Sequence, residues 1–204
     1  DASKSRGLGD VYKRQNKHTQ ATQVSDSALS DIEILVSQME IPSQEIEKLF
    51  IRASEKNCYR ILNVAPAIEL SANLFSQTDL FVVNEIELEF LAKKQIRSTD
   101  LDSIKDCIDS LSLKQHQSIV VTLGSRGVYV SQNYQSEFIE SHKVNAIDTT
   151  GSGDCFIGAL ASALLDKHNL FESAIFANKA AALSVTKKGA ATSMPTSKEV
   201  LSFR

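Results

Sequence analysis

The segment DTTGSGD at residues 148–154 has the small and acidic residues that phosphate chemistry requires. Three small residues let the backbone approach a ligand closely, namely Gly151, Ser152 and Gly153. An apolar helix is predicted to begin near Asp154, and the unpaired N–H groups of its first turn would point at the same loop. We interpret the loop as an anion seat, in which the amides of 151–153 hold charge on a transferred phosphoryl group and Asp154 faces an attacking hydroxyl.

A structural interpretation of this segment is also open. The glycines suit a tight turn, and Asp154 could be the N-cap of the helix, since aspartate is a favoured cap residue. The segment is not the phosphate-binding loop GxxxxGK[ST], because no lysine follows its last glycine.

Three other polar segments have local explanations. Asn84 and Glu87 have the spacing of a helix capping box. The run TLGSRG at 122–127 is typical of a strand end followed by a hairpin turn. The run from Lys187 to Pro195 indicates a helix C-terminus followed by glycine and proline.

Apolar runs alternate with helical patterns, which predicts β-α-β units and a parallel sheet. The predicted strands are Glu33–Ser37, Tyr59–Val64, Leu80–Val83 and Ser118–Leu123, with antiparallel edge strands at Gly127–Ser131 and Glu137–Glu140. The predicted helices are Ser43–Lys56, Glu85–Lys93, Leu101–Leu113, Cys155–Lys167, Phe171–Lys187 and Ser197–Phe203. Ligands bind at the carboxyl ends of parallel strands, so the segments at 84, 122 and 148 should converge.

The composition excludes several classes of function. A chain of 204 residues with 42% hydrophobic and 23% charged residues is typical of a globular protein. The net charge of -3 argues against a nucleic-acid partner, and no apolar segment is long enough to predict a membrane span. The three cysteines and four histidines have neither disulfide-framework nor zinc-site spacing, so we expect a cytoplasmic protein.

DTTGSGD followed by an apolar helix resembles the second signature of the ribokinase-like sugar kinases, also called the pfkB family. Further segments are similar to family segments in the same order: QME at 38, NVAPA at 63, VVNEIELEFL at 82, VVTLGSRGVYV at 120 and AALSVTKKGAATSMP at 181. The resemblance implies a three-layer, ribokinase-like α/β fold with a mostly parallel sheet. It begins near Asn16, so the fold is expected to be truncated at its amino terminus and to lack the family's lid.

The resemblance also implies a division of the chain. Residues 1–15 are polar, without helical or strand periodicity, and are expected to be a disordered, non-native leader. Residues 16–204 would be a partial kinase domain that carries the ATP site and the catalytic base.

The resemblance assigns a nucleotide site with Mg²⁺. Asn84 would approach the phosphates and Glu87 would hold Mg²⁺ through water. Asn178 would close the far side of the adenine, although a solvated helix residue is the alternative. The remaining residues of the ATP site would be Thr122, Leu123, Gly124, Ser125, Arg126, Gly127, Gly153 and Asp154.

A monovalent cation, K⁺, and the sugar complete the implied site. The residues around the cation would be Asp148, Thr150, Ser184, Lys187, Gly189 and Ser193; oxygen atoms are the ligands that a hard cation takes. Glu40 would hydrogen-bond the sugar beside Asp154, and a solvated loop residue is its alternative.

The implied activity is transfer of the γ-phosphate of ATP to a small sugar. D-Ribose, phosphorylated at O5, is favoured by Glu40 and NVAPA; fructose, a fructose phosphate or deoxyribose are alternatives. Because the resemblance lacks the family's amino-terminal substrate contacts, this chain alone is expected to be weakly active or inactive, and a nucleotide-binding fragment without activity is a further alternative. A homodimer of the complete protein stays open.

Overall fold

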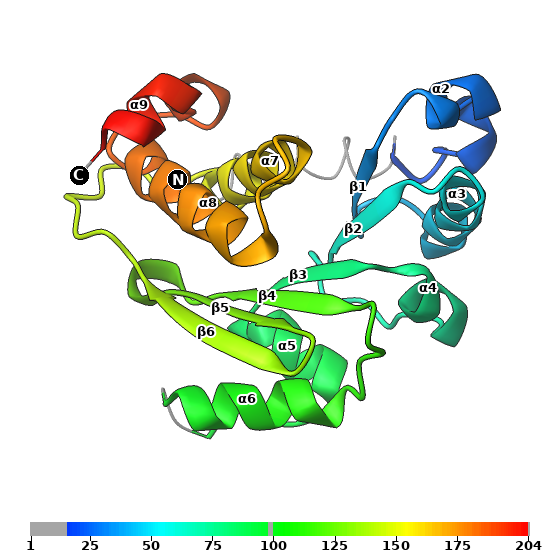
Figure 1. Cartoon of the computed structure of the whole chain (residues 1–204), viewed down its shortest axis with the longest axis horizontal. Coiled ribbons are helices and arrows are strands. Elements are labelled where there is room, and N and C mark those ends of the chain that lie inside the picture. Colours follow the sequence, from blue (N-terminus) through cyan, green and yellow to red (C-terminus); the bar gives the residue numbers. More distant parts are fainter. Residues whose placement is uncertain (1–15, 98–99, 204) are drawn as a thin grey trace, which may run out of the picture. The chain divides into compact units, whose positions relative to one another are not determined.

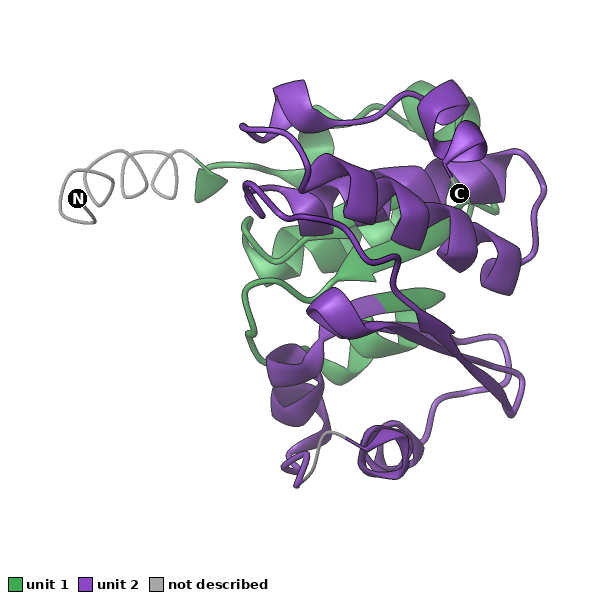
Figure 2. Cartoon of the chain, turned by 90° about the vertical axis from the view of Figure 1, so that its left-hand side faces the viewer, with its two compact units in different colours: residues 1–81 green, residues 82–204 purple. Residues whose placement is uncertain are grey.

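A computed structural model of the protein describes residues 16–97 and 100–203. The predicted leader, residues 1–15, lies outside the described residues. The chain divides into two compact units, Asp1–Phe81 and Val82–Arg204 (Figure 2). Most candidate site residues belong to the second unit.

Within the described residues, six strands form one sheet in chain order (Figure 1). They are β1 (Ile34–Gln38), β2 (Tyr59–Asn63), β3 (Leu80–Asn84), β4 (Ser118–Thr122), β5 (Gly127–Gln132) and β6 (Gln135–Glu140). β1 and β2 are parallel, with Val36 opposite Ile61, whereas β5 is antiparallel to both β4 and β6. Helices connect the first four strands, as the predicted β-α-β order requires, and the predicted antiparallel pair β5–β6 is confirmed.

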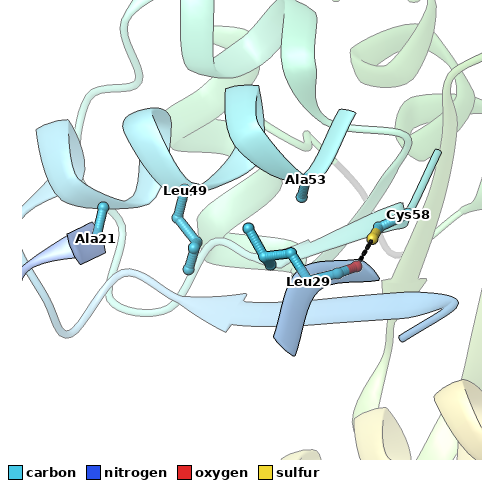
Figure 3. Close-up of a cluster of buried hydrophobic side chains, with 5 residues drawn as sticks. All are labelled: Ala21, Leu29, Leu49, Ala53 and Cys58. Atoms are coloured by element: carbon cyan, nitrogen blue, oxygen red, sulfur yellow. Dashed lines mark hydrogen bonds between the residues drawn. The ribbon is translucent and has the colours of Figure 1, made fainter. Parts of the chain in front are cut away.

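The first unit is built around α3 (Ser43–Ser54), which packs on β1 and β2. Its buried residues Ile46, Leu49, Phe50 and Ala53 recur at the spacing of one helix face. Figure 3 shows Leu49 and Ala53 beside Ala21, Leu29 and Cys58, whose Sγ donates to the Leu29 carbonyl at 3.1 Å. The described part of this unit also contains α2 (Asp26–Ser30), α4 (Ala72–Gln77) and the 3₁₀ turn η1 (Ala21–Gln23).

An ion pair in this unit joins β2 to the residue that precedes β3. Arg60 of β2 donates through Nε and Nη2 to the two carboxylate oxygens of Asp79, at 2.7 and 2.6 Å. The Arg60 amide donates to the same carboxylate at 2.8 Å, so Asp79 fixes the start of β3 against β2.

The second unit has three layers (Figure 1). α5 (Glu85–Ala92) and α6 (Leu101–Ser110) cover one face of β4–β6, and α7 (Ser152–Leu165) and α8 (Leu170–Ser184) cover the other. Ser118–Val121 of β4 are buried, which explains why this strand is a continuous apolar run rather than an alternating one. Two 3₁₀ turns, η2 (Gly124–Arg126) and η3 (Ala191–Ser193), and the short helix α9 (Ser197–Ser202) complete the described elements.

Several predicted boundaries are wrong by a few residues. α7 begins at Ser152 rather than near Asp154, and α8 ends at Ser184 rather than at Lys187. α2 and α4, of five and six residues, were not predicted, because such short segments show only a weak helical period. In residues 16–97 and 100–203, no helix combines the length and the hydrophobicity that crossing a bilayer demands.

Candidate active site

The start of α7 is made by a glycine rather than by an aspartate cap. Gly151 is the N-cap residue, with φ 76° in the left-handed region, and Asp154 is the third residue of the helix. The interpretation of Asp154 as N-cap is therefore wrong, because the turn is made three residues earlier by a residue that adopts this φ without a steric cost. The Asp154 side chain is exposed.

The amides of this loop are not equivalent. Ser152 donates its N–H to the Thr149 carbonyl at 3.2 Å, so one of the three predicted anion-binding amides is already engaged. Among the described residues, no acceptor receives the N–H of Gly151 or of Gly153. A Cβ built on Gly153 has no other heavy atom within 4 Å, so a ligand has room to approach the backbone there.

Cys155, the residue after Asp154, anchors the first turn of α7 in the core. Cys155 is buried and packs with Ala180 of α8 and Val200 of α9. Burial raises the pKa of its thiol. The first turn of α7 thus has one exposed side, which carries Asp154, and one side held in the core.

Asp148 clamps this loop to the loop after α8. Its Oδ1 accepts from the hydroxyl and the amide of Thr150, at 2.6 and 3.0 Å, and its Oδ2 accepts from the Gly189 amide at 3.0 Å. The Thr150 hydroxyl, then the Gly189 and Thr150 amides, lower the pKa of Asp148 to about 2. The carboxylate is therefore ionised at neutral pH and joins two segments that are distant in sequence.

The segment after α8 is held by its own contacts. Ser184 and Ser193 are buried, and their hydroxyls donate to the carbonyls of Ala181 and Ala190 at 2.8 and 2.7 Å. Lys187 Nζ lies 3.1 Å from Glu199 of α9. Within the part of the chain that the structure describes, no three His, Cys, Asp or Glu side chains form a metal-binding cluster. Any cation bound here would thus rely on hydroxyl and carbonyl oxygens besides Asp148.

The capping box at the start of α5 is confirmed. Asn84 Oδ1 accepts from the Glu87 amide at 2.9 Å, and Glu87 Oε2 accepts from the Asn84 amide at 2.8 Å. Glu87 is buried, and this burial raises the pKa of its carboxyl group. A nearby cation would stabilise the ionised form that burial opposes.

The loop at 122–127 is a tight turn closed by backbone hydrogen bonds. Leu123 donates to the Gly127 carbonyl at 2.8 Å, and Arg126 donates to the Leu123 carbonyl at 3.2 Å. Gly127 has φ 126°, and a Cβ there would overlap the carbonyl oxygen of Ile139 in β6. The predicted hairpin turn is confirmed, and only glycine fits its last position.

Asn178 is buried on α8, so the alternative of a solvated helix residue is wrong. Its Nδ2 donates to the Glu140 carbonyl at 3.0 Å, which ties α8 to the end of β6. Glu40 belongs to the first unit and is exposed in the turn after β1. The neighbouring Met39 amide donates to the Ala65 carbonyl at 2.9 Å, which connects QME with the NVAPA segment.

The family model for pfkB carbohydrate kinases matches residues 8–197, which is most of the chain. The chain belongs to the pfkB family of carbohydrate kinases. This confirms the family that the signature at 148–154 predicted.

Individual pfkB proteins show the same similarity. The chain is 39% identical to a ribokinase from Staphylococcus aureus over 174 residues, which cover 85% of this chain and 57% of that protein. It is 37% identical to a ribokinase from Haemophilus influenzae over 180 residues, which cover 88% and 58%. The chain thus spans less than two thirds of the length of these curated relatives.

Solved structures of ribokinases share the fold. A ribokinase structure from Thermotoga maritima matches with a TM-score of 0.78 and 31% identity, over 91% of this chain and 61% of that one. An Arabidopsis thaliana ribokinase complexed with ribose and ATP matches with a TM-score of 0.79 and 26% identity, over 86% and 57%. The predicted three-layer α/β fold is confirmed.

Two contacts near the predicted site were not foreseen from the sequence. Arg126 pairs with Glu85 at 2.5 Å, and Lys187 pairs with Glu199. The charges themselves were visible, but nothing in the spacing of Glu85 and Arg126 indicates that the two meet.

Proposed function

We propose that the complete pfkB protein transfers the γ-phosphate of ATP to O5 of D-ribose, which yields ribose 5-phosphate and ADP. The observation that carries this proposal is the first turn of α7, where the exposed Asp154 follows two glycines whose amides have no acceptor among the described residues. Similarity to two ribokinases at 39% and 37% identity supports ribose as the acceptor.

In this mechanism Asp154 is the general base. Its carboxylate accepts the proton of the sugar hydroxyl while the oxygen forms a bond to the γ-phosphorus and the bond from phosphorus to the β-phosphate oxygen breaks. The amides of Gly151 and Gly153 stabilise the charge on the transferred group.

The nucleotide would be held by three segments of the second unit. They are Asn84 with Glu87, the 122–127 turn, and Asn178 of α8. Glu87 fits a role beside Mg²⁺, because its buried carboxylate has Oε2 on the Asn84 amide and would gain from a neighbouring cation. When bound, Mg²⁺ would neutralise phosphate charge.

K⁺ would lie behind the anion-binding loop. Asp148 fits it only in part, because Oδ1 already accepts two hydrogen bonds and Oδ2 accepts one. A carboxylate oxygen has two lone pairs, so one position on Oδ2 remains. The other proposed oxygens come from Thr150, Ser184, Lys187, Gly189 and Ser193. When bound, the cation would steady the loop that carries Gly151.

The sugar contact is proposed for Glu40, whose exposed carboxylate is available to hydroxyl groups. Turnover with ribose, fructose, fructose 6-phosphate and deoxyribose at equal concentration separates ribokinase from the other pfkB activities. Ribose should have the highest kcat/KM. A larger kcat/KM for one of the other three sugars would identify that sugar, rather than ribose, as the substrate.

The central test is Asp154→Asn in the complete protein. We expect turnover to fall at least ~10²-fold, since loss of a general base costs ~10²- to 10⁴-fold, while ATP affinity changes little. Asp166→Asn, at the exposed C-terminal end of the same helix, is the matched control and should keep turnover. Full turnover in the Asp154 variant would rule out this base.

The second candidate is a nucleotide-binding fragment without kinase activity. It is favoured because the chain spans 57% and 58% of two relatives, and because its proposed ATP residues all lie in the second unit. The isolated 204-residue chain should then bind ATP without phosphorylating ribose. Efficient ribose turnover by that chain would contradict this candidate.

A further inference from the structure

An ion pair links two of the segments to which we assign the nucleotide. Arg126 Nη2 in the 122–127 turn lies 2.5 Å from Glu85 Oε1, at the first position of α5. The two side chains are 31% and 38% exposed, so each is partly shielded from solvent. Glu85 directly follows the cap residue Asn84.

The backbone on the arginine side is fixed. The Arg126 carbonyl accepts from the Ser141 amide at 3.0 Å, and its own N–H donates to Leu123. The next residue, Gly127, leaves no space for a side chain beside Ile139. The turn is therefore anchored to β5 and β6, and the Arg126 side chain extends from that anchor to α5.

A longer hydrogen bond also joins the 122–127 turn to β3, the strand before α5. Thr122 Oγ1 donates to the Val83 carbonyl at 3.3 Å, which joins the strand ends but not the start of α5. Glu85 and Glu87 put two carboxyl groups in the first turn of that helix. An anionic polyphosphate would be repelled by both, and a guanidinium on Glu85 offsets one of them.

We propose that Arg126 is a positioning residue that acts through Glu85. It holds the start of α5 against the 122–127 turn and neutralises Glu85, so that a nucleoside triphosphate meets Glu87 as the one uncompensated acid of that helix turn. This rests on the proposed nucleotide site. It differs from direct contact between Arg126 and the nucleotide.

Charge reversal separates positioning from direct contact. Calorimetry on the complete protein would measure binding of Mg²⁺ with a non-hydrolysable ATP analogue. Arg126→Gln should weaken binding about three- to fivefold, the upper part of the range expected for a partly exposed pair. The double variant Arg126→Glu with Glu85→Arg should return to within about twofold of the original affinity. Lys105→Gln, which breaks the Lys105–Asp109 pair on α6, is the matched control and should leave affinity unchanged.

A swapped pair that binds as weakly as Arg126→Gln would overturn the proposal, because a direct phosphate contact is not restored by exchange. Unchanged affinity in Arg126→Gln would overturn it as well.

Amide exchange without nucleotide gives a readout that does not depend on the proposed function. In Arg126→Gln, residues 84–89 should exchange at least about threefold faster, while residues 127–132 of β5 keep their rates. Unchanged exchange at 84–89 would also overturn the proposal. If the protein binds no nucleotide but shows this exchange pattern, the proposed function is contradicted, whereas the positioning of α5 by Arg126 is still supported.

Discussion

The 122–127 turn and the 148–154 loop are both rich in glycine, but they are held in different ways. Backbone hydrogen bonds close the first, and its Gly127 is enclosed by Ile139 and Ser141. The second is held by the Asp148 carboxylate, and its Gly153 borders open space. An enclosed glycine serves the fold, whereas a glycine beside open space leaves its backbone accessible to a ligand. The signature motif alone does not make this distinction.

Gly127→Ala should have the largest effect of the changes that test this contrast. A methyl group would overlap the Ile139 carbonyl and lie 2.8 Å from the Ser141 amide, at a φ that other residues avoid. We expect a loss of at least about 3 kcal/mol in the free energy of unfolding, measured in urea. Gly124→Ala has open space and a φ of 57°, so it should cost only roughly 1 kcal/mol. Equal losses of unfolding free energy in the two variants would show that Gly127 is no more constrained than Gly124.

Gly153→Ala should affect activity without affecting the fold. The added methyl group has no protein neighbour within 4 Å, and alanine favours a helix, so stability should rise by up to about 1 kcal/mol. Turnover should fall at least about tenfold, because the methyl group would enter the space that we propose for the phosphoryl group. Gly158→Ala on the same helix also has open space and is the matched control. Loss of activity in both variants would point to the helix rather than to the loop.

Asp148→Asn should change the acid sensitivity of the second loop. Its pKa is lowered from 3.8 to about 2, so the ionised group stabilises the fold above about pH 4, and that stability is lost as the pH falls toward 2. The difference in urea midpoint between the original protein and the variant should therefore shrink over this range. The 122–127 turn is closed by backbone hydrogen bonds, so the amide exchange of Leu123 and Arg126, corrected for intrinsic rates, should depend less on pH over this range. A constant midpoint difference would show that the carboxylate charge is not what holds the loop.

Much of the fold could be predicted because its signals are local or periodic. The apolar run of β4, the amphipathic face of α3 and the capping box of Asn84 and Glu87 are all visible in the sequence. The start of α7 was misplaced because aspartate is a common cap, and a left-handed glycine performs that function here. The short helices α2 and α4 were missed because five or six residues show only a weak helical period.

The candidate site was predicted as three segments, but not as a set of contacts. The clamp from Asp148 to Gly189 and the pair of Arg126 with Glu85 each span about 40 residues, and no local rule connects such positions. The burial of Asn178 was also unforeseen, because its partner is a backbone carbonyl of β6. Residue types therefore predicted the chemistry, whereas long-range hydrogen bonds decide which residues support it.

Val200 of α9 belongs to the same buried cluster as Cys155, the residue that follows the proposed base. This makes the carboxyl-terminal helix a poor attachment point for a purification tag or a fluorescent fusion. A fusion that displaced α9 would remove Val200 from this cluster, and the first turn of α7 would lose part of the packing that holds it. Low activity in such a preparation would then result from the attached tag or fusion rather than from the protein itself.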